Sequence, residues 1–156
     1  MIAAEVVAQL ESPSSLLVGS VGSDGVPDAT RGWGVQVLGP DRLRVLLSDN
    51  ADRTLANLAD GGRIALTTTH FQTLVSWQLK GRAIAIGPVT AADRIRFDAF
   101  CAGCVQILHQ TDGTPEEIIW RLAPPGIVAC EMVVEQVFDQ TPGPEAGARI
   151  APVGAR

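Results

Sequence analysis

The stretch that decides the fold is residues 16–48, LLVGSVGSDGVPDATRGWGVQVLGPDRLRVLLS. An apolar run at 16–21 and an extended run at 26–38 are joined by GSDG, whose residues tolerate positive φ and are typical of hairpin turns. GPD then turns the chain into 42–48, where apolar side chains fall on alternate positions, as in a strand with one buried face. The stretch therefore predicts three consecutive strands, and hairpin connections make them antiparallel.

Outside this stretch, the chain adds further strands and a few helices. We expect strands over 63–69, 74–86 and 127–138, and helices over 3–10, from Asp52 to Gly61, over 91–108 and over 114–122. Asp52 is the expected N-cap of the second helix, and Thr114 opens a capping box with Pro115 at the first position of the last helix. Six strands with few helices between them predict a mainly β fold, a small antiparallel barrel that is closed or partly closed, with peripheral helices.

Length and composition indicate one globular domain. The chain has 156 residues, of which 46% are hydrophobic and 19% charged, so it can bury a core without disulfide bonds. We expect one domain over 1–138, with a helical insertion at about 91–122, and a Pro- and Gly-rich tail over 139–156. No stretch is apolar for the ~18 residues that a membrane span needs, and residues 1–10 lack the features of a secretion signal. We therefore expect a soluble, cytoplasmic protein without a membrane partner.

Charge and cysteine content exclude some classes of function. Twelve Lys and Arg residues against seventeen Asp and Glu residues give a net charge of −5, which argues against a broad cationic face for nucleic acid. Cys101 and Cys104 have the spacing of a redox or metal pair, but i, i+3 places both thiols on one apolar helix face, so we interpret them as packing residues. His70 and His109 are the only histidines and do not have the spacing of a zinc site, so no metal is expected.

Three segments carry a resemblance to a known family: PDATRGW at 27–33, LSDNADRTLANL at 47–58 and WQLKGRA at 77–83. In this order and spacing they resemble the FMN-binding split barrels related to pyridoxamine 5'-phosphate oxidase, including the small FMN-binding proteins and the general-stress-type members. The resemblance covers roughly residues 10–90 and, by position, the last strand. It implies a six-stranded split β-barrel of the Greek-key type, a homodimer with cofactor sites between two barrels, and FMN as the cofactor.

The expected short helix carries the predicted phosphate site, because a phosphate binds well to Arg side chains and to free backbone N–H groups at a helix N-terminus. Arg53 lies in the first turn, and the resemblance assigns it to the FMN phosphate, while Ser48 and Thr54 are further residues expected to bind the cofactor. Where the family has Ser or Thr and then Lys, this chain has Asp52 and Thr54, which removes a positive charge and adds a negative one. Phosphate affinity should be lower for that reason, unless Arg31 supplies the missing charge.

The flat ring of FMN needs a backbone or apolar platform and hydrogen bonds at its polar edge. Gly32 permits close approach of the backbone and Trp33 offers a stacking surface. A bulge in the strand explains the glycine equally well, and Trp33 also suits the core or a dimer contact. On the long strand that follows the short helix, the resemblance places Ser76 at the ring edge and makes Gln78 a register-shifted substitute.

The resemblance implies an FMN-dependent oxidoreductase with a small-molecule substrate that the sequence does not identify. An alternative is a non-catalytic protein on the same barrel that binds or senses a flavin, haem or deazaflavin, or that has lost its cofactor. In that case Arg31 and Arg53 are ordinary surface cations. A third interpretation is a thiol protein that works through Cys101 and Cys104.

Overall fold

The computed structural model describes residues 1–150, and its strands follow the predicted pattern. The strands are β1 (Ser15–Val21), β2 (Pro27–Val37), β3 (Arg42–Ser48), β4 (Arg63–Thr69), β5 (Ser76–Gly87), β6 (Ile127–Asp139) and β7 (Arg149–Ile150). The helices are α1 (Ala4–Leu10), α2 (Asp52–Ala59), α3 (Ala91–Asp112) and α4 (Glu116–Trp120). The first hairpin forms where GSDG allows it, because Gly25 adopts a φ of 75° and its N–H donates to the carbonyl of Gly22 at 3.1 Å.

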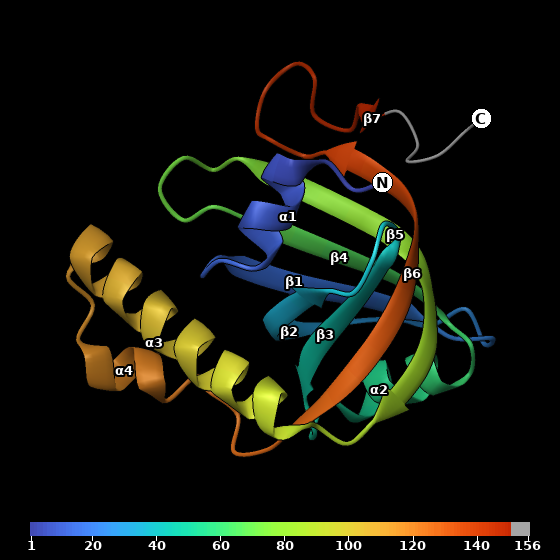
Figure 1. Cartoon of the computed structure of the whole chain (residues 1–156), viewed down its shortest axis with the longest axis horizontal. Coiled ribbons are helices and arrows are strands. Elements are labelled where there is room, and N and C mark those ends of the chain that lie inside the picture. The colour runs from blue at the N-terminus through green and yellow to red at the C-terminus, as the bar shows by residue number, and fades with distance from the viewer. Residues whose placement is uncertain (151–156) are drawn as a thin grey trace.

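Six strands close into an antiparallel barrel. The strand order is β3-β2-β1-β4-β5-β6-β7, and β3 also pairs with β6, which closes the sheet around β1 to β6. The long, curved β6 makes this closure possible because it pairs with β5 on one side and with β3 on the other (Figure 1). The expected mainly β fold with a six-stranded antiparallel barrel and peripheral helices is confirmed, and β7 is an additional strand.

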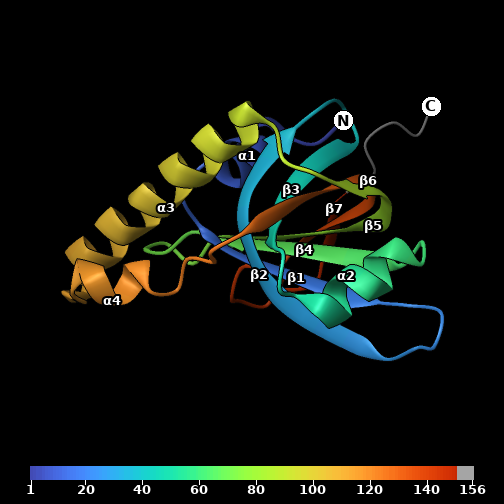
Figure 2. The same ribbon diagram turned by 90° about the horizontal axis from the view of Figure 1, so that it is seen from below.

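The barrel interior holds the apolar core. Its side chains come from alternate positions of the strands, as the period of two requires, and among the most deeply buried are Leu43, Val45, Leu47, Leu66, Leu79 and Met132. Two short helices lie on opposite sides of the barrel, α1 with Val6 and Leu10 in the core and α2 with Leu58 (Figures 1 and 2). Each such side chain contributes roughly 1.5–3 kcal/mol when it leaves water, so the helices are held mainly by this burial.

The helical insertion packs outside the barrel against β2 (Figure 2). A capping box begins α3, since the N–H of Asp93 donates to Thr90 Oγ1 at 3.1 Å and the N–H of Thr90 donates to the Asp93 carboxylate at 2.8 Å. Gly113, with a φ of 73°, ends the helix. The ring centroids of Trp33 on β2 and Phe97 on α3 are 6.4 Å apart. The insertion therefore lies beside the strand that carries the predicted ring platform.

The helix ends are where the prediction is wrong. Ala51 is the N-cap of α2 and makes no capping bond through its side chain, while Asp52 is already helical. The capping box predicted at Thr114 is absent, because the N–H of Thr114 donates to Asp112 Oδ1 at 2.9 Å and the residue belongs to the turn after α3. Pro115 is the N-cap of α4 instead. Caps depend on the direction of the chain before the helix, which local composition does not define.

The predicted C-terminal tail returns to the sheet only at the end of its described part, where Arg149–Ile150 form β7 after a stretch of turns. Ile150 pairs with Val137 and Arg149 with Phe138, and Ile150 also packs against the core. Residues 151–156 of the predicted tail lie outside the described residues. Within residues 1–150, the helices lack the combination of length and apolar character that crossing a bilayer demands.

Candidate functional site

Arg53, the predicted phosphate ligand, lies on the exposed side of the first turn of α2. Its Nη2 donates to Asp24 Oδ2, on the turn between β1 and β2, at 2.5 Å. The Arg53 side chain is 44% exposed and that of Asp24 52%, so water and salt weaken this ion pair. Hydrogen bonds from the Val26 N–H and from Arg53 lower the pKa of Asp24 and so favour its charged form. A ligand that carries a phosphate must compete with this carboxylate for Arg53.

The N-terminus of α2 also offers backbone donors. The first intrahelical bond runs from the N–H of Leu55 to the carbonyl of Ala51 at 2.9 Å, and no side chain caps the helix. The N–H groups of Asp52, Arg53 and Thr54 therefore have no partner within residues 1–150. Free N–H groups at this end of the helix attract an anion. The Asp52 carboxylate in the same turn is negative and reduces this attraction.

Thr54, which stands where the family has Lys, faces into the barrel. Its side chain is fully buried, and Oγ1 donates to Asp28 Oδ2 on β2 at 2.7 Å. Thr54, Asn57 and Leu58 share this buried side of α2, as i, i+3 and i+4 positions do. The structure thus separates Thr54 from Arg53, and a ligand that contacts the Arg53 side chain does not reach the threonine hydroxyl.

The two predicted serines are buried and bonded within the chain. Ser48, at the end of β3, is 6% exposed, and its Oγ donates to Asn50 Oδ1 at 2.6 Å. Ser76, at the start of β5, is 5% exposed, and its Oγ donates to the carbonyl of Leu74 at 2.8 Å. The N–H of Ser76 donates to Thr141 Oγ1 at 3.1 Å, so the segment after β6 covers this end of β5. Neither hydroxyl is presented to solvent in this arrangement.

The predicted ring platform on β2 is built around a bulge. The register with β3 shifts between Gly32 and Val35, and Gly34 has a φ of 135°. This φ requires glycine, whereas a Cβ at position 34 would make an ordinary contact of 3.6 Å with Arg96 Cγ on α3. Trp33 packs on Phe97 of α3. A cavity of about 60 Å³ remains between this strip and the helices. That volume is far below the roughly 300 Å³ of the smallest typical ligand pockets.

Arg31 and Gln78 lie on the same outer face of the barrel but on strands that are not neighbours. Leu17 on β1 pairs with Arg31 on β2 and with Thr67 on β4, and Thr67 pairs with Gln78 on β5. These pairs form one row of neighbouring residues across the four strands. Three strand spacings separate the two ends of this row, roughly 14 Å at about 4.8 Å each. Gln78 Nε2 donates to Thr67 Oγ1 at 3.1 Å.

Solved structures share this architecture, although no family model and no curated protein matches the sequence. HupZ of Group A Streptococcus superposes with a TM-score of 0.56 at 18% identity, covering 94% of this chain and 100% of that chain. A candidate pyridoxamine 5'-phosphate oxidase from Lactobacillus delbrueckii gives 0.54 at 17% identity over 88% of this chain and 93% of that chain. An F420 reductase superposes with a TM-score of 0.55 at 16% identity, covering 83% of this chain and 93% of that chain. The chain has the split-barrel fold. At sequence identities of 16–18%, these comparisons show a shared fold and nothing more.

The residues of this split barrel fit a flavin phosphate in part. Arg53 and the free N–H groups of α2 supply one charge and several donors. The second cation that the resemblance implies is missing, since residue 54 is Thr and its side chain is turned inward, and the nearby side chains Asp24 and Asp52 are acidic. The ring side fits only if the insertion moves away from Trp33, because the present cavity is too small for three fused rings.

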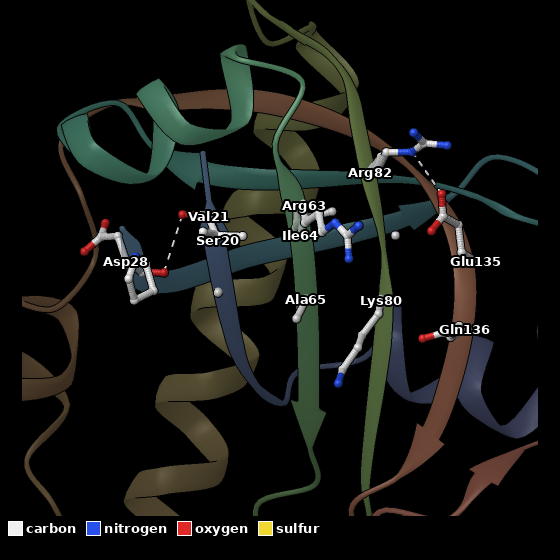
Figure 3. Close-up of a pocket in the computed structure, with 13 residues that line it drawn as sticks. Ser20, Val21, Asp28, Arg63, Ile64, Ala65, Lys80, Arg82, Glu135 and Gln136 are labelled. Carbon is white, nitrogen blue, oxygen red and sulfur yellow. Dashed lines mark hydrogen bonds and ion pairs between the residues drawn. The ribbon is translucent and has the colours of Figure 1, made fainter. Parts of the chain in front are cut away.

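Sequence reasoning missed another feature of the split barrel, an open groove of about 580 Å³ on the outer face of β1, β4 and β5 (Figure 3). Arg63, Lys80 and Arg82 line it from neighbouring strands. The alternation of each strand indicates that these side chains point outward. Only the pairing of β4 with β5 shows that the three cations are neighbours.

The two helical cysteines are packing residues, as the sequence predicts. Cys101 is 3% exposed, and Cys104 packs against the core. Burial is the main cause that raises the pKa of Cys101 to about 11 and that of Cys104 to about 12. Thiols with such pKa values are almost entirely protonated at neutral pH and are poor nucleophiles.

Proposed function

We propose that this split barrel binds a flavin-type cofactor, FMN or a deazaflavin, and acts as an oxidoreductase on a small-molecule substrate. The fold that it shares with the candidate pyridoxamine 5'-phosphate oxidase and with the F420 reductase, over 88% and 83% of the chain, supports this proposal. The observation that carries it is Arg53, an exposed cation at the uncapped N-terminus of α2, where its weak partner Asp24 can be exchanged for a phosphate.

In this proposal each residue has a limited role. Arg53 and the adjacent backbone N–H groups hold the phosphate, and the backbone at Gly32 with the Trp33 side chain borders the ring once the helical insertion has moved away from Trp33. A bound flavin supplies the hydride or electron transfer, while the protein binds and orients it. The chain's own contribution is therefore positioning.

We extend the proposal to a homodimer that shares its cofactor sites. Arg31 and Gln78 lie on one outer face of the barrel, so one chain alone covers only one side of a flavin ring that lies there. A second copy can bring its own Gln78 to the ring edge beside Arg31. Light scattering on the purified protein measures the mass, and a monomer that binds flavin with full affinity would remove this part of the proposal.

A non-catalytic binding or sensing protein is the second candidate. It is favoured by the inward Thr54 and by the acidic Asp24 and Asp52 around the single cation, which reduce the affinity for a phosphate. Such a protein would hold a flavin, a deazaflavin or haem without turning over a substrate.

Absorbance spectroscopy and cofactor binding test the proposal. The purified protein is examined for flavin, deazaflavin and Soret bands, and the Kd for added FMN is then measured by quenching of FMN fluorescence. Arg53→Ala should weaken FMN binding at least about tenfold, because a hydrogen bond to a charged group contributes roughly 1.5–3 kcal/mol. Arg94→Ala removes the same charge from an exposed position on α3 and should leave the Kd within twofold.

The possible results separate the candidates. Unchanged FMN affinity in Arg53→Ala would overturn the phosphate assignment. A Soret band would favour haem, and a colourless protein that takes up neither flavin nor deazaflavin would overturn the proposal. Tight flavin binding without reduction by nicotinamide or deazaflavin donors would favour the sensing function.

A further inference from the structure

The helical insertion carries an open groove of its own. The helices α3 and α4 lie side by side outside the barrel (Figures 1 and 2), and the groove between them has a volume of about 430 Å³. From α3 it is lined by Ala102, Gln106 and Gln110, whose spacing of four residues places them on one helix face. Glu116 and Trp120 line it from α4 with the same spacing. The volume lies within the roughly 300–1,000 Å³ that is typical of small-molecule sites.

Trp120 supplies an aromatic surface in this groove. It is 44% exposed, whereas the preceding Ile119 is 7% exposed, so the isoleucine holds α4 in place and much of the indole remains open to solvent. Among aromatic side chains, the face of Trp attracts a cation most strongly. A planar guanidinium group can also stack on such a face, which a round ammonium group cannot do.

The polar groups of the groove offer hydrogen-bond acceptors. His109 Nδ1 lies 2.9 Å from the carbonyl oxygen of Thr114. A carbonyl can only accept, so Nδ1 carries the proton of the neutral ring and Nε2 keeps a free lone pair. The Glu116 carboxylate forms no ion pair with any residue of 1–150, and Gln106 and Gln110 add two amide oxygens. A ligand group with several N–H donors and no acceptor therefore matches the groove.

The electrostatic surroundings of the groove favour a cation. Glu116 carries the formal charge among its lining residues, and no Lys or Arg of residues 1–150 lines it. Asp112 and Glu117 add negative charge close by in the chain, against one cation, Arg121, at the end of α4. The groove also lies toward the C-terminus of the 22-residue α3, the negative end of the helix dipole. A positively charged ligand is therefore attracted, and an anion is repelled.

We propose that this groove binds the guanidinium group of a small organic cation, which stacks on Trp120 and donates hydrogen bonds to the Glu116 carboxylate and to His109 Nε2. A guanidinium group has five N–H donors and no acceptor, and its planar fork can pair with a carboxylate through two parallel hydrogen bonds. An ammonium group has the charge without the plane, and a urea group has the plane without the charge, so both match the groove less well. The site is separate from Arg53 and does not require that the chain bind a flavin.

Titration of the full chain with n-butylguanidinium, n-butylammonium and n-butylurea tests this proposal. The three probes share one alkyl chain and differ in charge and planarity. Binding followed by 15N–1H chemical shifts should perturb the indole of Trp120 and the amides of α3 and α4 around the groove. Butylguanidinium should bind at least about fivefold more tightly than butylurea, because hydrogen bonds to a charged group are stronger. It should also bind more tightly than butylammonium, because it can stack on the indole.

Matched variants distinguish the site from a general charge effect. Glu116→Gln should weaken butylguanidinium at least about threefold and leave butylurea nearly unchanged, because it removes a charge and keeps the shape. Glu117→Gln makes the same change at an exposed residue outside the groove lining and should leave both affinities within about 1.5-fold. Trp120→Leu should abolish the preference for butylguanidinium over butylammonium, and Trp120→Phe, which keeps an aromatic ring, should retain part of it.

Several results would overturn the proposal. These are equal affinities for butylguanidinium and butylurea, equal losses in Glu116→Gln and Glu117→Gln, or perturbations centred on the barrel strands. Self-association gives a different pattern. If a second copy of the chain covers the groove, Glu116→Gln will change the mass measured by light scattering while the affinity for butylguanidinium stays the same. That outcome would also overturn the ligand site.

Discussion

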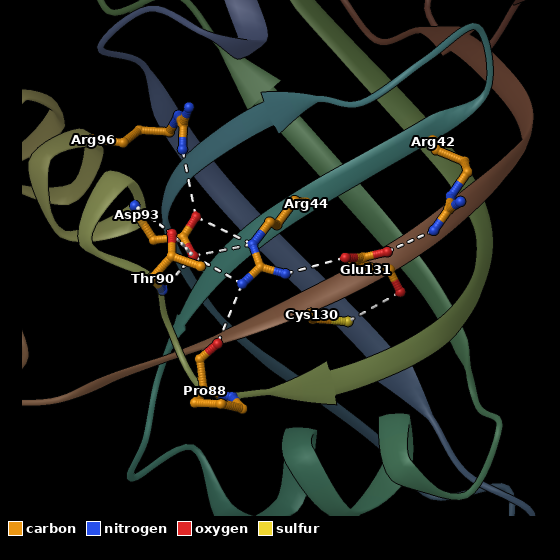
Figure 4. A network of polar contacts seen from close by, with 8 residues as sticks. All are labelled: Arg42, Arg44, Pro88, Thr90, Asp93, Arg96, Cys130 and Glu131. Carbon is orange, nitrogen blue, oxygen red and sulfur yellow. Dashed lines mark hydrogen bonds and ion pairs between the residues drawn. The ribbon is translucent and has the colours of Figure 1, made fainter.

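Asp93 joins the helical insertion to the barrel, and replacing it with Asn should destabilise the protein strongly. Its side chain is only 2% exposed and accepts hydrogen bonds from Arg44 Nε at 3.1 Å and Arg44 Nη2 at 2.8 Å (Figure 4). It also accepts the N–H of Thr90 at 2.8 Å, which forms the cap of α3. One carboxylate thus binds both the partly buried guanidinium of Arg44 on β3 and the first turn of the helix.

The size of the expected loss in unfolding free energy follows from the pKa of Asp93. The hydrogen bonds from Arg44 are the main cause that lowers this pKa from 3.8 to about 2, which corresponds to roughly 2 kcal/mol in favour of the charged form. Asn keeps the shape but loses the charge. Arg44 would still bond Glu131 at 3.1 Å and the Pro88 carbonyl at 3.2 Å, so the cost stays below the roughly 3–5 kcal/mol of a fully unpaired buried charge. We expect Asp93→Asn to lower the free energy of unfolding by about 2–3 kcal/mol.

Urea denaturation at pH 7, followed by tryptophan fluorescence and by circular dichroism, measures this change. A loss of that size should also lower Tm by roughly 4–12 °C for a chain of this length. Asp98→Asn is the matched control, because it makes the same chemical change at an exposed position of the same helix. That variant should stay within about 0.5 kcal/mol of the wild type.

The pH dependence provides a second readout of the same contact. A carboxylate whose pKa is lower in the folded state stabilises the fold above its unfolded pKa, near 3.8, and loses this effect as the pH falls through about 2. The difference in unfolding free energy between wild type and Asp93→Asn should therefore shrink between pH 5 and pH 2. A difference below about 0.5 kcal/mol at pH 7, or one that stays constant over this pH range, would refute the reasoning.

Three further changes test other parts of the structure. Gly81→Ala should cost about 2–3 kcal/mol or more in urea denaturation, because a Cβ there would lie 1.8 Å from the carbonyl oxygen of Val133 on β6. Thr54→Lys, which restores the family residue, should lower Tm without tightening FMN binding, because the side chain is fully buried against Asp28. Cys104, whose pKa burial raises to about 12, should react with iodoacetamide at pH 8 at least about 100-fold more slowly than a free thiol.

Each of these has a control. Gly19→Ala should be tolerated, since its Cβ would meet only Ala65 O at 3.9 Å, and equal losses at both glycines would contradict the packing argument. Thr54→Val keeps the volume and should cost less than the lysine, whereas tighter FMN binding in Thr54→Lys would show that this position faces the cofactor. Cys104 should react at the ordinary rate in urea, and fast alkylation of the native protein would contradict its burial.

The strands were predictable because their signals are local. Residues 42–48 and 63–69 were expected as strands and form β3 and β4 with the same bounds. Alternation of apolar residues reports a half-buried strand, and turns rich in Gly, Pro and Asp report its ends. The N-cap of α2 was misplaced at Asp52 because capping depends on how the preceding loop enters the helix.

The candidate site was predictable to a smaller extent. Arg53 was expected in the first turn of the short helix, and it lies there with free N–H groups beside it. Its contact with Asp24 was not foreseen, since the two residues meet only through the packing of α2 beside the first hairpin. The inward direction of Thr54 had a usable signal, because Leu58 lies four residues later on the same helical face.

The sequence by itself determined the order of strands and turns, and with it the closed barrel, because burial of alternate side chains and the freedom of turn residues act over a few neighbouring positions. Tertiary structure alone decided which charges meet. Arg44 with Asp93, and Arg63 with Lys80, are brought together by strand register and helix docking between distant segments. Electrostatic interactions depend on distance and on burial, and both are defined only after the barrel has closed.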